Sequence, residues 1–350
     1  MAPISIRLDR VSKRFDHTVK GEVYAVREVS LAVAEGELLT LLGPSGCGKS
    51  TTLRMIAGFE EPSEGKISID DRDVTHVLPN RRGIGFVFQN YALFPHLSVF
   101  ENVAYGLRVQ RKSGAEITRA VSEVLELVGL ARYKRQHPHQ LSGGEQQRVA
   151  LARAVVFQPK VLLFDEPLSN LDAKLRVEMR EQIRTLQKRI GITTVYVTHD
   201  QEEAMAISDR IAVMERGQVV QDGSAQELYY RPATEFVARF IGRTNLLEAR
   251  IVSAAEIEIK GARIAFVSGK APGSTVMIVV RPEMITLKPD GSAGGRIVQR
   301  TFLGEKTDYQ VALRGTVLQV TTSGQSVAGL LEPGAAVSVQ FKPEGMHALG

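Results

Sequence analysis

The sequence contains almost no cysteine. Its 350 residues include a single one, Cys47, so no disulfide can form within the chain and no zinc site can be built from several thiolates. A chain with so little cysteine suits a reducing compartment such as the cytoplasm.

Charge of one sign is not in excess, and long apolar runs are missing. Lysine and arginine number 44 against 39 acidic residues, a net charge of +5, so no strong electrostatic attraction to nucleic acid or anionic lipid is expected. The longest uncharged stretch, 83–100, is interrupted by polar residues such as Gln89 and Asn90, whereas a membrane-spanning helix needs about 20 mostly apolar residues. The N-terminal segment also lacks the apolar centre of a signal peptide.

The remaining composition is that of a globular protein with 43% apolar and 24% charged residues. Up to about Phe240, short β-branched runs alternate with helical segments, which indicates a mostly parallel sheet with crossover helices. The runs are apolar throughout, as in strands covered on both faces. The expected strands lie at 37–43, 84–89, 161–167, 193–199 and 210–215.

Two further segments differ from this pattern. Strand signals stop within 91–159, where helical spacing predicts an inserted helical subdomain. After Asn245, short alternating runs broken by glycine, proline and aspartate predict a small all-β sandwich or barrel over 245–350. The domain boundary is expected between Phe240 and Asn245, after a first domain over 1–240.

A glycine-rich segment that follows the first apolar strand has the pattern of a phosphate-binding loop. Its backbone N–H groups and the start of the next helix favour an anion. Lys49 is expected to reach the β- and γ-phosphates, and the Ser50 hydroxyl to ligate Mg²⁺. The nucleotide-binding residues predicted in this loop are Gly43, Pro44, Ser45, Gly46, Cys47, Gly48, Lys49, Ser50 and Thr51.

Two adjacent carboxylates, Asp165 and Glu166, end the strand at 161–167. Burying both is costly unless a cation or a proton uses them. We therefore expect Asp165 to bind Mg²⁺, directly or through water, and Glu166 to take the proton of an attacking water. A solvated acidic turn is the alternative.

A second glycine-rich helix start, Leu141-Ser-Gly-Gly-Glu-Gln-Gln-Arg148, precedes this strand. Together with GPSGCGKST, Gln89, VLLFDEP, Asp172 of SNLD and His199, it makes residues 4–240 resemble the ATP-binding cassette (ABC) family. The resemblance implies an α/β P-loop NTPase fold and an ATPase in which two chains enclose two ATP molecules head to tail. Ser142, Gly143, Gly144 and Glu145 of one chain would then contact the γ-phosphate held by the other, although glutamine is commoner than glutamate at position 145.

The resemblance also implies roles for single residues. Glu166 is the general base, His199 orients the γ-phosphate and the water, and Gln89 contacts Mg²⁺ or water. For Asp172, a role as a helix N-cap and a role in the dimer contact are equally well supported. Phe15 stands where the family stacks an aromatic ring on adenine, and Tyr24 is the alternative.

A cassette without spanning helices must act on other chains. The stretch 90–106 is rich in aromatic and apolar groups and could dock a helix of a membrane partner, with Tyr91, Leu93, Phe94 and His96 as expected contacts. The C-terminal domain is similar to the accessory oligomer-binding-like (TOBE) domain of importers for polyamines, ferric iron, sulfate or sugars. The resemblance thus implies a homodimer on the cytoplasmic face of the inner membrane, with two transmembrane permease subunits and a solute-binding protein outside the membrane.

Two other classes of protein are alternatives. A soluble cassette ATPase acting on nucleic acid is disfavoured by the balanced charge and by the presence of only four aromatic residues after Asn245. A P-loop kinase or GTPase that works alone leaves the segment 141–148 and His199 unexplained.

Overall fold

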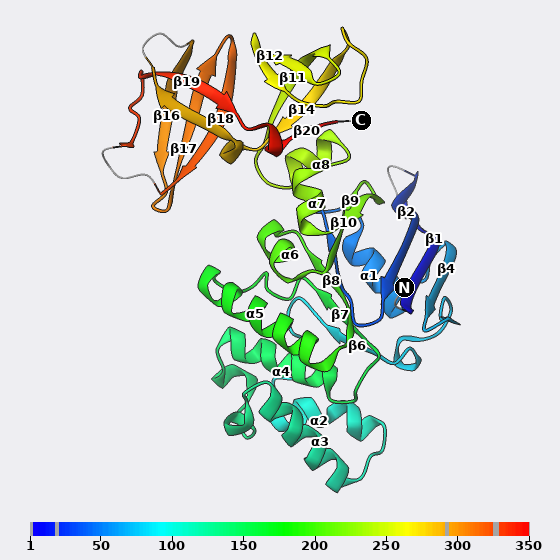
Figure 1. Ribbon diagram of the computed structural model, residues 1–350. Coiled ribbons are helices and arrows are strands. Elements are labelled where there is room, and N and C mark those ends of the chain that lie inside the picture. The colour runs from blue at the N-terminus through cyan, green and yellow to red at the C-terminus, as the bar shows by residue number, and fades with distance from the viewer. Residues whose placement is uncertain (1–2, 18–20, 291–293, 325–328, 350) are drawn as a thin grey trace. The chain divides into compact units, whose positions relative to one another are not determined.

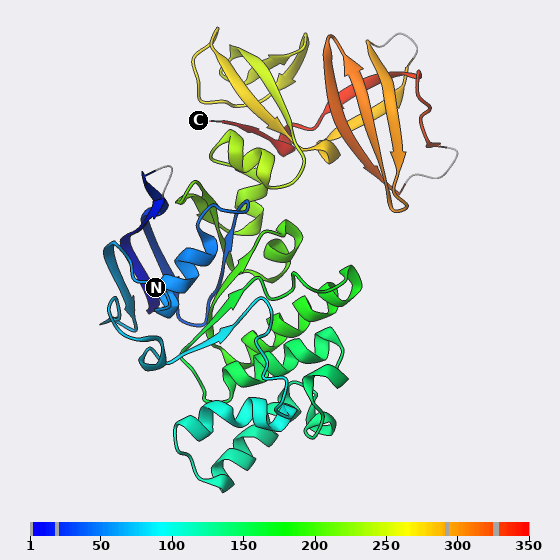
Figure 2. The same ribbon diagram turned by 180° about the vertical axis from the view of Figure 1, so that it is seen from behind.

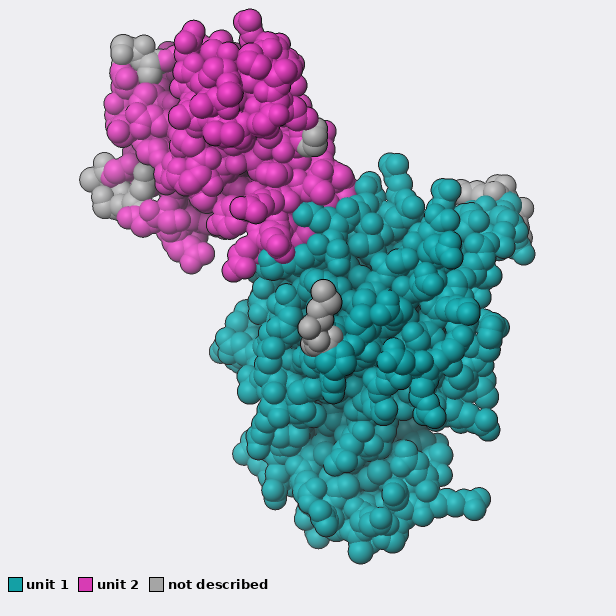
Figure 3. Space-filling model, turned by 45° about the vertical axis from the view of Figure 1, so that its right-hand side comes forward, with its two compact units in different colours: residues 1–225 teal, residues 226–350 magenta. Residues whose placement is uncertain are grey.

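The computed structural model describes residues 3–17, 21–290, 294–324 and 329–349. The chain divides into two compact units, Met1–Ala225 and Gln226–Gly350, which Figure 3 shows in teal and magenta. The helices α7 (Ala225–Tyr230) and α8 (Glu235–Phe240) therefore group with the second unit, which begins earlier in the chain than the boundary expected at 240–245. Among the described residues, no helix has the length and apolar character needed to cross a membrane.

A six-stranded sheet forms the centre of the first unit, in the order β10-β9-β3-β8-β7-β6 (Figure 1). The five strands expected from the sequence are its parallel part, and β10 joins one edge as an antiparallel strand. The strands are β3 (Leu38–Leu42), β6 (Ile84–Val87), β7 (Val161–Asp165), β8 (Thr193–Thr198), β9 (Arg210–Glu215) and β10 (Gln218–Gly223).

Both faces of this sheet are covered, which explains why every residue of its inner strands β3, β7 and β8 is buried and most of them are apolar or threonine. In β7, Val161 and Leu163 face one apolar cluster, and Leu162 and Phe164 face another. The first cluster includes α1 (Lys49–Ala57), and the second includes α5 (Ala173–Ile190) and the helical insertion. Alternate side chains of one strand thus face two different cores. Figures 1 and 2 show the sheet from opposite sides, with α1 on one face and α5 on the other. The short helix α6 (Gln201–Ile207) follows β8.

A second, antiparallel sheet was not expected from the sequence. Its order is β2-β1-β4-β5, and its strands are β1 (Ile4–His17), β2 (Gly21–Ala34), β4 (Glu64–Ile69) and β5 (Arg72–Asp73). Register shifts interrupt the pairing of β1 with β2 and with β4, and the first half of β2 is mostly exposed. Because bulges and exposed residues break the alternation of apolar and polar residues, the sequence pattern is weak there.

The predicted helical insertion contains α2 (Val99–Val109), α3 (Gly114–Leu127) and α4 (Gly143–Val155). Each begins with the same capping box, in which a serine and the glutamate three residues later satisfy each other's backbone N–H groups. The pairs are Ser98 with Glu101, Ser113 with Glu116, and Ser142 with Glu145.

The second unit contains two five-stranded antiparallel sheets around one core, as predicted for a small all-β domain. The first, in the order β13-β12-β11-β14-β20, comprises β11 (Asn245–Ser253), β12 (Glu256–Ile259), β13 (Ala262–Ala265), β14 (Thr275–Val280) and β20 (Met346–Ala348). The second, in the order β15-β19-β16-β17-β18, comprises β15 (Ile285–Pro289), β16 (Gly295–Phe302), β17 (Lys306–Leu313), β18 (Thr316–Ser323) and β19 (Ala336–Phe341).

Arg281 ties the helices α7 (Ala225–Tyr230) and α8 (Glu235–Phe240) to these strands. Its side chain is 1% exposed and donates hydrogen bonds to the carbonyl oxygens of Tyr229, Ala238 and Arg243 at 2.6–3.1 Å. Its guanidinium also lies 4.1 Å from the centre of the Tyr229 ring. A buried cation needs such a full set of acceptors, so both helices pack with the β domain.

Candidate functional site

The phosphate-loop pattern lies where the sequence predicts it, between β3 and α1. Gly48 has φ +102°, and a Cβ atom there would lie 2.4 Å from the carbonyl oxygen of Ala25. A Cβ atom on Gly43 would lie 2.4 Å from the carbonyl oxygen of Met214. Neither position can hold a side chain without moving backbone, so these glycines allow the loop to curl tightly at the start of α1.

Lys49 and Cys47 are buried inside this loop, 4% and 3% exposed. The Lys49 ammonium donates to the carbonyl oxygens of Gly43 at 2.8 Å and Pro44 at 3.0 Å, so it closes the loop on itself. Burial raises the pKa of the Cys47 thiol, although Lys49 opposes this shift. The thiol is therefore protonated near neutral pH and unreactive.

Ser50 and Asp165 come together across 115 positions of sequence. The Ser50 hydroxyl donates to Asp165 Oδ1 at 2.7 Å, and Arg54 of the same helix lies 3.7 Å from Oδ2. A hydroxyl and a carboxylate at the end of a buried strand are the hard oxygen ligands that Mg²⁺ prefers. The donor set therefore fits a magnesium ion beside the phosphate loop.

Glu166 is held in a strained backbone conformation next to His199. Its φ is +46°, in the left-handed region that only glycine adopts readily, and its N–H donates to the carbonyl oxygen of Val197 at 3.0 Å. His199 Nδ1 lies 3.1 Å from Glu166 Oε2. Both side chains line a small cavity that has room for a water molecule.

Two residues that were not predicted as site residues, Ser169 and Asn170, connect Gln89 to Glu166. The Gln89 side-chain amide donates to Ser169 Oγ at 3.3 Å, and that hydroxyl donates to the carbonyl oxygen of Glu166 at 2.9 Å. Asn170 donates in turn to the carbonyl oxygen of Gln89 at 2.9 Å. Ser169 and Asn170 belong to the SNLD segment, whose Asp172 alone was selected. That aspartate caps α5, accepting from the Leu175 N–H at 2.9 Å.

The turn 142–145 is not part of this group. Among the described residues, no hydrogen bond or ion pair connects it to the phosphate loop. Ser142 is exposed at the start of α4, and Glu145 accepts from its N–H and from its hydroxyl, both at 2.9 Å. A Cβ atom on Gly143 would lie 3.0 Å from a methyl group of Leu171, and one on Gly144 would lie 2.9 Å from Leu175. The turn therefore packs closely on the segment that leads into α5.

The two aromatic candidates for adenine binding, Phe15 and Tyr24, are each 42% exposed. Phe15 pairs with Val23, and Tyr24 with Arg14, in continuous register on β1 and β2. Since neighbouring residues of a strand point to opposite faces, the two rings lie on opposite faces of this sheet. One of them at most can stack on a given base.

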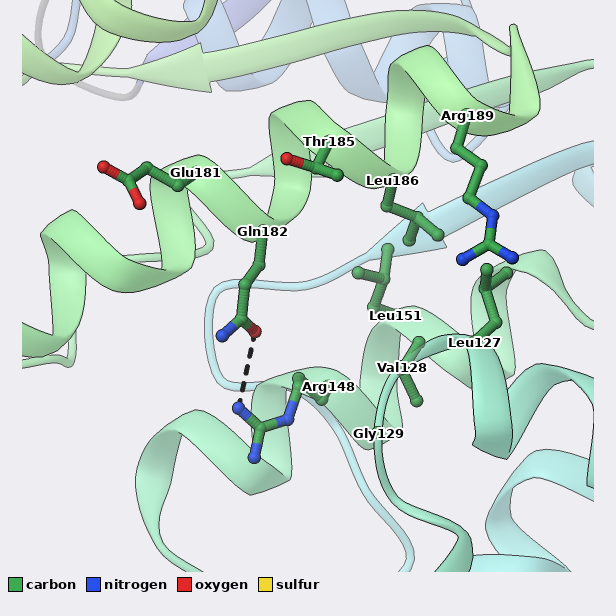
Figure 4. A pocket seen from close by; sticks show the side chains of 10 residues that line it. All are labelled: Leu127, Val128, Gly129, Arg148, Leu151, Glu181, Gln182, Thr185, Leu186 and Arg189. Carbon is green, nitrogen blue, oxygen red and sulfur yellow. Dashed lines mark hydrogen bonds between the residues drawn. The ribbon is translucent and has the colours of Figure 1, made fainter.

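A larger pocket of about 520 Å³ contains none of the predicted site residues. Leucine side chains from α3, α4 and α5 form its apolar part, and Arg148 and Gln182 lie at one end with a hydrogen bond of 3.4 Å between them (Figure 4). Arg189 lies at the other end. Size alone therefore does not identify the site of chemistry in this chain.

Comparison with known proteins identifies the family of this chain. The family model described as ABC transporter matches residues 26–169, and that of the TOBE domain matches residues 278–349. The chain is similar to the dimeric structure of MJ0796, a bacterial ABC transporter cassette, with a TM-score of 0.57 and 36% identity over 63% of this chain and 98% of that one. A second dimeric structure of MJ0796, in a post-hydrolysis state bound to ADP and Pi, matches with a TM-score of 0.56 and 35% identity over the same shares.

Relatives that match almost the whole chain carry the names of importers. The spermidine/putrescine import ATP-binding protein PotA of Rubrobacter xylanophilus is 47% identical, covering 99% of this chain and 94% of the relative. The Fe(3+) ions import ATP-binding protein FbpC 1 of Pectobacterium atrosepticum is 45% identical, covering 98% and 96%. These names do not favour an ATPase that acts on nucleic acid. The chain therefore belongs to the ABC transporter family, and it is an ATP-hydrolysing subunit of the kind found in importers.

Proposed function

We propose that two copies of this chain bind two ATP molecules between them and drive the import of a small solute through membrane subunits. The supporting observation is that, within one chain, the predicted site residues form two separate groups. Lys49, Ser50, Asp165 and Glu166 lie together, whereas the exposed Ser142 turn has no hydrogen bond to the phosphate loop among the described residues. A second copy would bring its own Ser142 to the γ-phosphate.

In this proposal, ATP phosphates take the place of the loop's own carbonyl oxygens as partners of Lys49. Glu166 accepts the proton of the attacking water. His199, 3.1 Å from the carboxylate, orients the γ-phosphate and the water. Gln89, linked to the Glu166 backbone through Ser169, contacts the water or the metal ion. Loss of a single contact of this kind costs about 10²–10³-fold in turnover.

Mg²⁺ is the metal proposed for the site, held by Ser50 and Asp165, with Gln89 nearby in the coordination sphere or joined to it by water. When bound, it neutralises charge that develops on the phosphate oxygens. The present hydrogen bond of 2.7 Å from Ser50 to Asp165 keeps both ligands close to each other before metal and nucleotide bind.

Three alanine variants test the shared site. Lys49→Ala should weaken ATP binding to a single chain, whereas Ser142→Ala should leave that binding intact and abolish ATP-dependent pairing and turnover. Ser113→Ala is the matched control, because Ser113 caps α3 with the same hydrogen bonds that Ser142 makes on α4. Both serine variants should lose about 1 kcal/mol of stability. Equal turnover of the Ser142→Ala and Ser113→Ala variants would refute the shared site.

For adenine we propose stacking on Phe15, with Tyr24 as the alternative. Stacking on one ring contributes about 1–3 kcal/mol, so Phe15→Ala should weaken nucleotide binding by about 5–150-fold. Because the two rings lie on opposite faces of the sheet, Tyr24→Ala should then have little effect. The reverse order would assign the role to Tyr24.

For the membrane partner, the structure changes the expected contacts. Tyr91 is only 6% exposed, and Leu93 packs against the core, so the prediction that Tyr91 contacts a partner is wrong. Tyr91 has φ +61°, and Arg153 donates to its carbonyl oxygen at 2.7 Å, which fixes a turn that directs the ring inward. Phe94 and His96 stay in the proposal.

Phe86 and Phe88, just before Gln89, form an aromatic cluster with Phe59, which follows α1. Phe59 is 47% and Phe88 36% exposed, and the ring centres of Phe86 and Phe88 are 4.4 Å apart. We propose that a permease helix docks on this cluster, close in sequence to Gln89. Phe59→Asp should then lose stimulation of ATPase activity by the permease and retain ATP-dependent pairing.

The cargo is a polyamine, ferric iron or another small solute, as the names of the relatives suggest. The remaining partners are two permease subunits and a solute-binding protein outside the membrane, with this chain at the cytoplasmic face of the inner membrane. Uptake of labelled spermidine or ferric iron, measured in cells that carry and lack the gene, tests this part. Unchanged uptake of both would leave the other small solutes as cargo.

A further inference from the structure

Glu145, in the turn that begins α4, makes three hydrogen bonds with Ser142. Glu145 Oε2 accepts from the Ser142 N–H and from the Ser142 hydroxyl, both at 2.9 Å, and the Glu145 N–H donates back to Ser142 Oγ at 3.3 Å. The hydroxyl proton of Ser142 is therefore already committed to a carboxylate of its own chain.

This carboxylate is ionised. The Ser142 N–H lowers the pKa of Glu145, and hydrogen bonds from the Tyr133 and Ser142 side chains lower it further. The Tyr133 hydroxyl in turn accepts from Arg132 at 2.6 Å, so the donors around Glu145 continue outward to a surface cation. Glu145 is thus a fixed negative charge beside Ser142.

A phosphate oxygen can bind the Ser142 hydroxyl only as an acceptor, because it has no hydrogen to donate at neutral pH. The hydroxyl must then turn its hydrogen away from Glu145, and the carboxylate is left next to a second anion. A hydrogen bond to a charged acceptor is roughly twice as strong as one to a neutral acceptor, so an ionised Glu145 holds the hydroxyl more firmly than an amide would.

We infer that Glu145 is a positioning residue that restrains the Ser142 hydroxyl and weakens the ATP-dependent pairing of two copies. This inference rests on the proposed shared site. Its consequence is a cassette that pairs less readily with ATP alone, and that depends more on its membrane partners to hold the two copies together.

Glu145→Gln is the test, because glutamine keeps an acceptor oxygen for the cap and removes the charge. The test is done in a Glu166→Gln background, which slows hydrolysis. Sedimentation velocity with ATP and Mg²⁺ measures the dissociation constant for pairing, and adding Glu145→Gln should lower this constant at least about five-fold relative to the Glu166→Gln parent. The ratio of the two dissociation constants should approach one as the salt concentration rises from about 0.05 to 0.5 M, because ions screen the repulsion between Glu145 and phosphate. A purely structural cap would show no such salt dependence.

Glu116→Gln provides the matched control. Its capping box on α3 has the same three hydrogen bonds at 2.7–3.3 Å, so its melting temperature should change as much as that of Glu145→Gln while pairing stays unchanged. Pairing of the Glu145→Gln variant that is equal to or weaker than the parent's would overturn the inference and leave the shared site standing. If ATP pairs neither variant, the shared site fails, and this inference fails with it.

Discussion

Replacing Glu166 by alanine and, separately, by glycine tests whether the proposed base is held in a strained backbone. Both variants lose the carboxylate, and both should lose about 10²–10⁴-fold in turnover. They differ in backbone freedom alone. At a φ of +46°, the left-handed backbone conformation lowers the free energy of unfolding by about 1–2 kcal/mol for a residue with a Cβ atom, and glycine avoids this strain.

Glycine also has a disadvantage, because it increases the conformational entropy of the unfolded chain, which lowers the free energy of unfolding by about 0.4–1 kcal/mol relative to alanine. The balance favours glycine by roughly 0.5–1 kcal/mol, which for a unit of the size of Met1–Ala225 is about 1–4 °C in melting temperature. Differential scanning calorimetry without nucleotide should therefore show Glu166→Gly melting above Glu166→Ala.

The exposed helical residue Glu178 of α5 provides the control. There the usual order should hold, with glycine about 1 kcal/mol less stable than alanine. If glycine melts at or below alanine at both positions, the strain at Glu166 is refuted.

Three further predictions concern reactivity, metal and pH. Cys47 is buried and the pKa of its thiol is raised, so a maleimide should modify it slowly in the folded protein at pH 7. Modification should be slower still with ATP bound, and rapid in urea. Fast modification of a protein that stays fully active would contradict the position of Cys47 inside the loop. Chelating Mg²⁺ should abolish turnover reversibly, and Asp165→Asn should raise the Mg²⁺ concentration needed for half-maximal activity, as a metal titration would measure. Partial burial raises the pKa of Asp209, but hydrogen bonds from Arg184, the Leu38 N–H and Lys188 outweigh it, and the net pKa lies below the ordinary value. The stability that this depressed pKa provides is present above about pH 4, the unfolded value, and is lost as pH falls towards the folded value. The gap in melting temperature between the parent and Asp209→Asn should therefore shrink from pH 5 to pH 2, and a constant gap would contradict this reading.

The sequence predicts the central sheet and the chemistry at its edge well, because both depend on local signals. Apolar runs covered on both faces identify β3 and β6–β9, and the glycine-rich loop before α1 depends on backbone geometry that few other residues permit. The predicted all-β domain is likewise confirmed, since its strands are short and separated by turn residues.

Other features depend on contacts between distant segments. The sheet of β1, β2, β4 and β5 contains bulges and exposed positions, so no clear alternation marks it. The inward turn of Tyr91 depends on Arg153, which lies 62 positions away. The positive φ of Glu166 and its link to Gln89 through Ser169 arise from tertiary structure and leave no pattern in the local sequence.

The central claim is that each ATP is hydrolysed between two copies of the chain. The most direct test is the ATPase activity per molecule of purified protein, measured over a range of protein concentrations that spans the ATP-dependent pairing constant. The account predicts that activity per molecule rises with concentration and levels off once pairs dominate. A constant activity per molecule, at concentrations where sedimentation shows single chains with ATP bound, would contradict it.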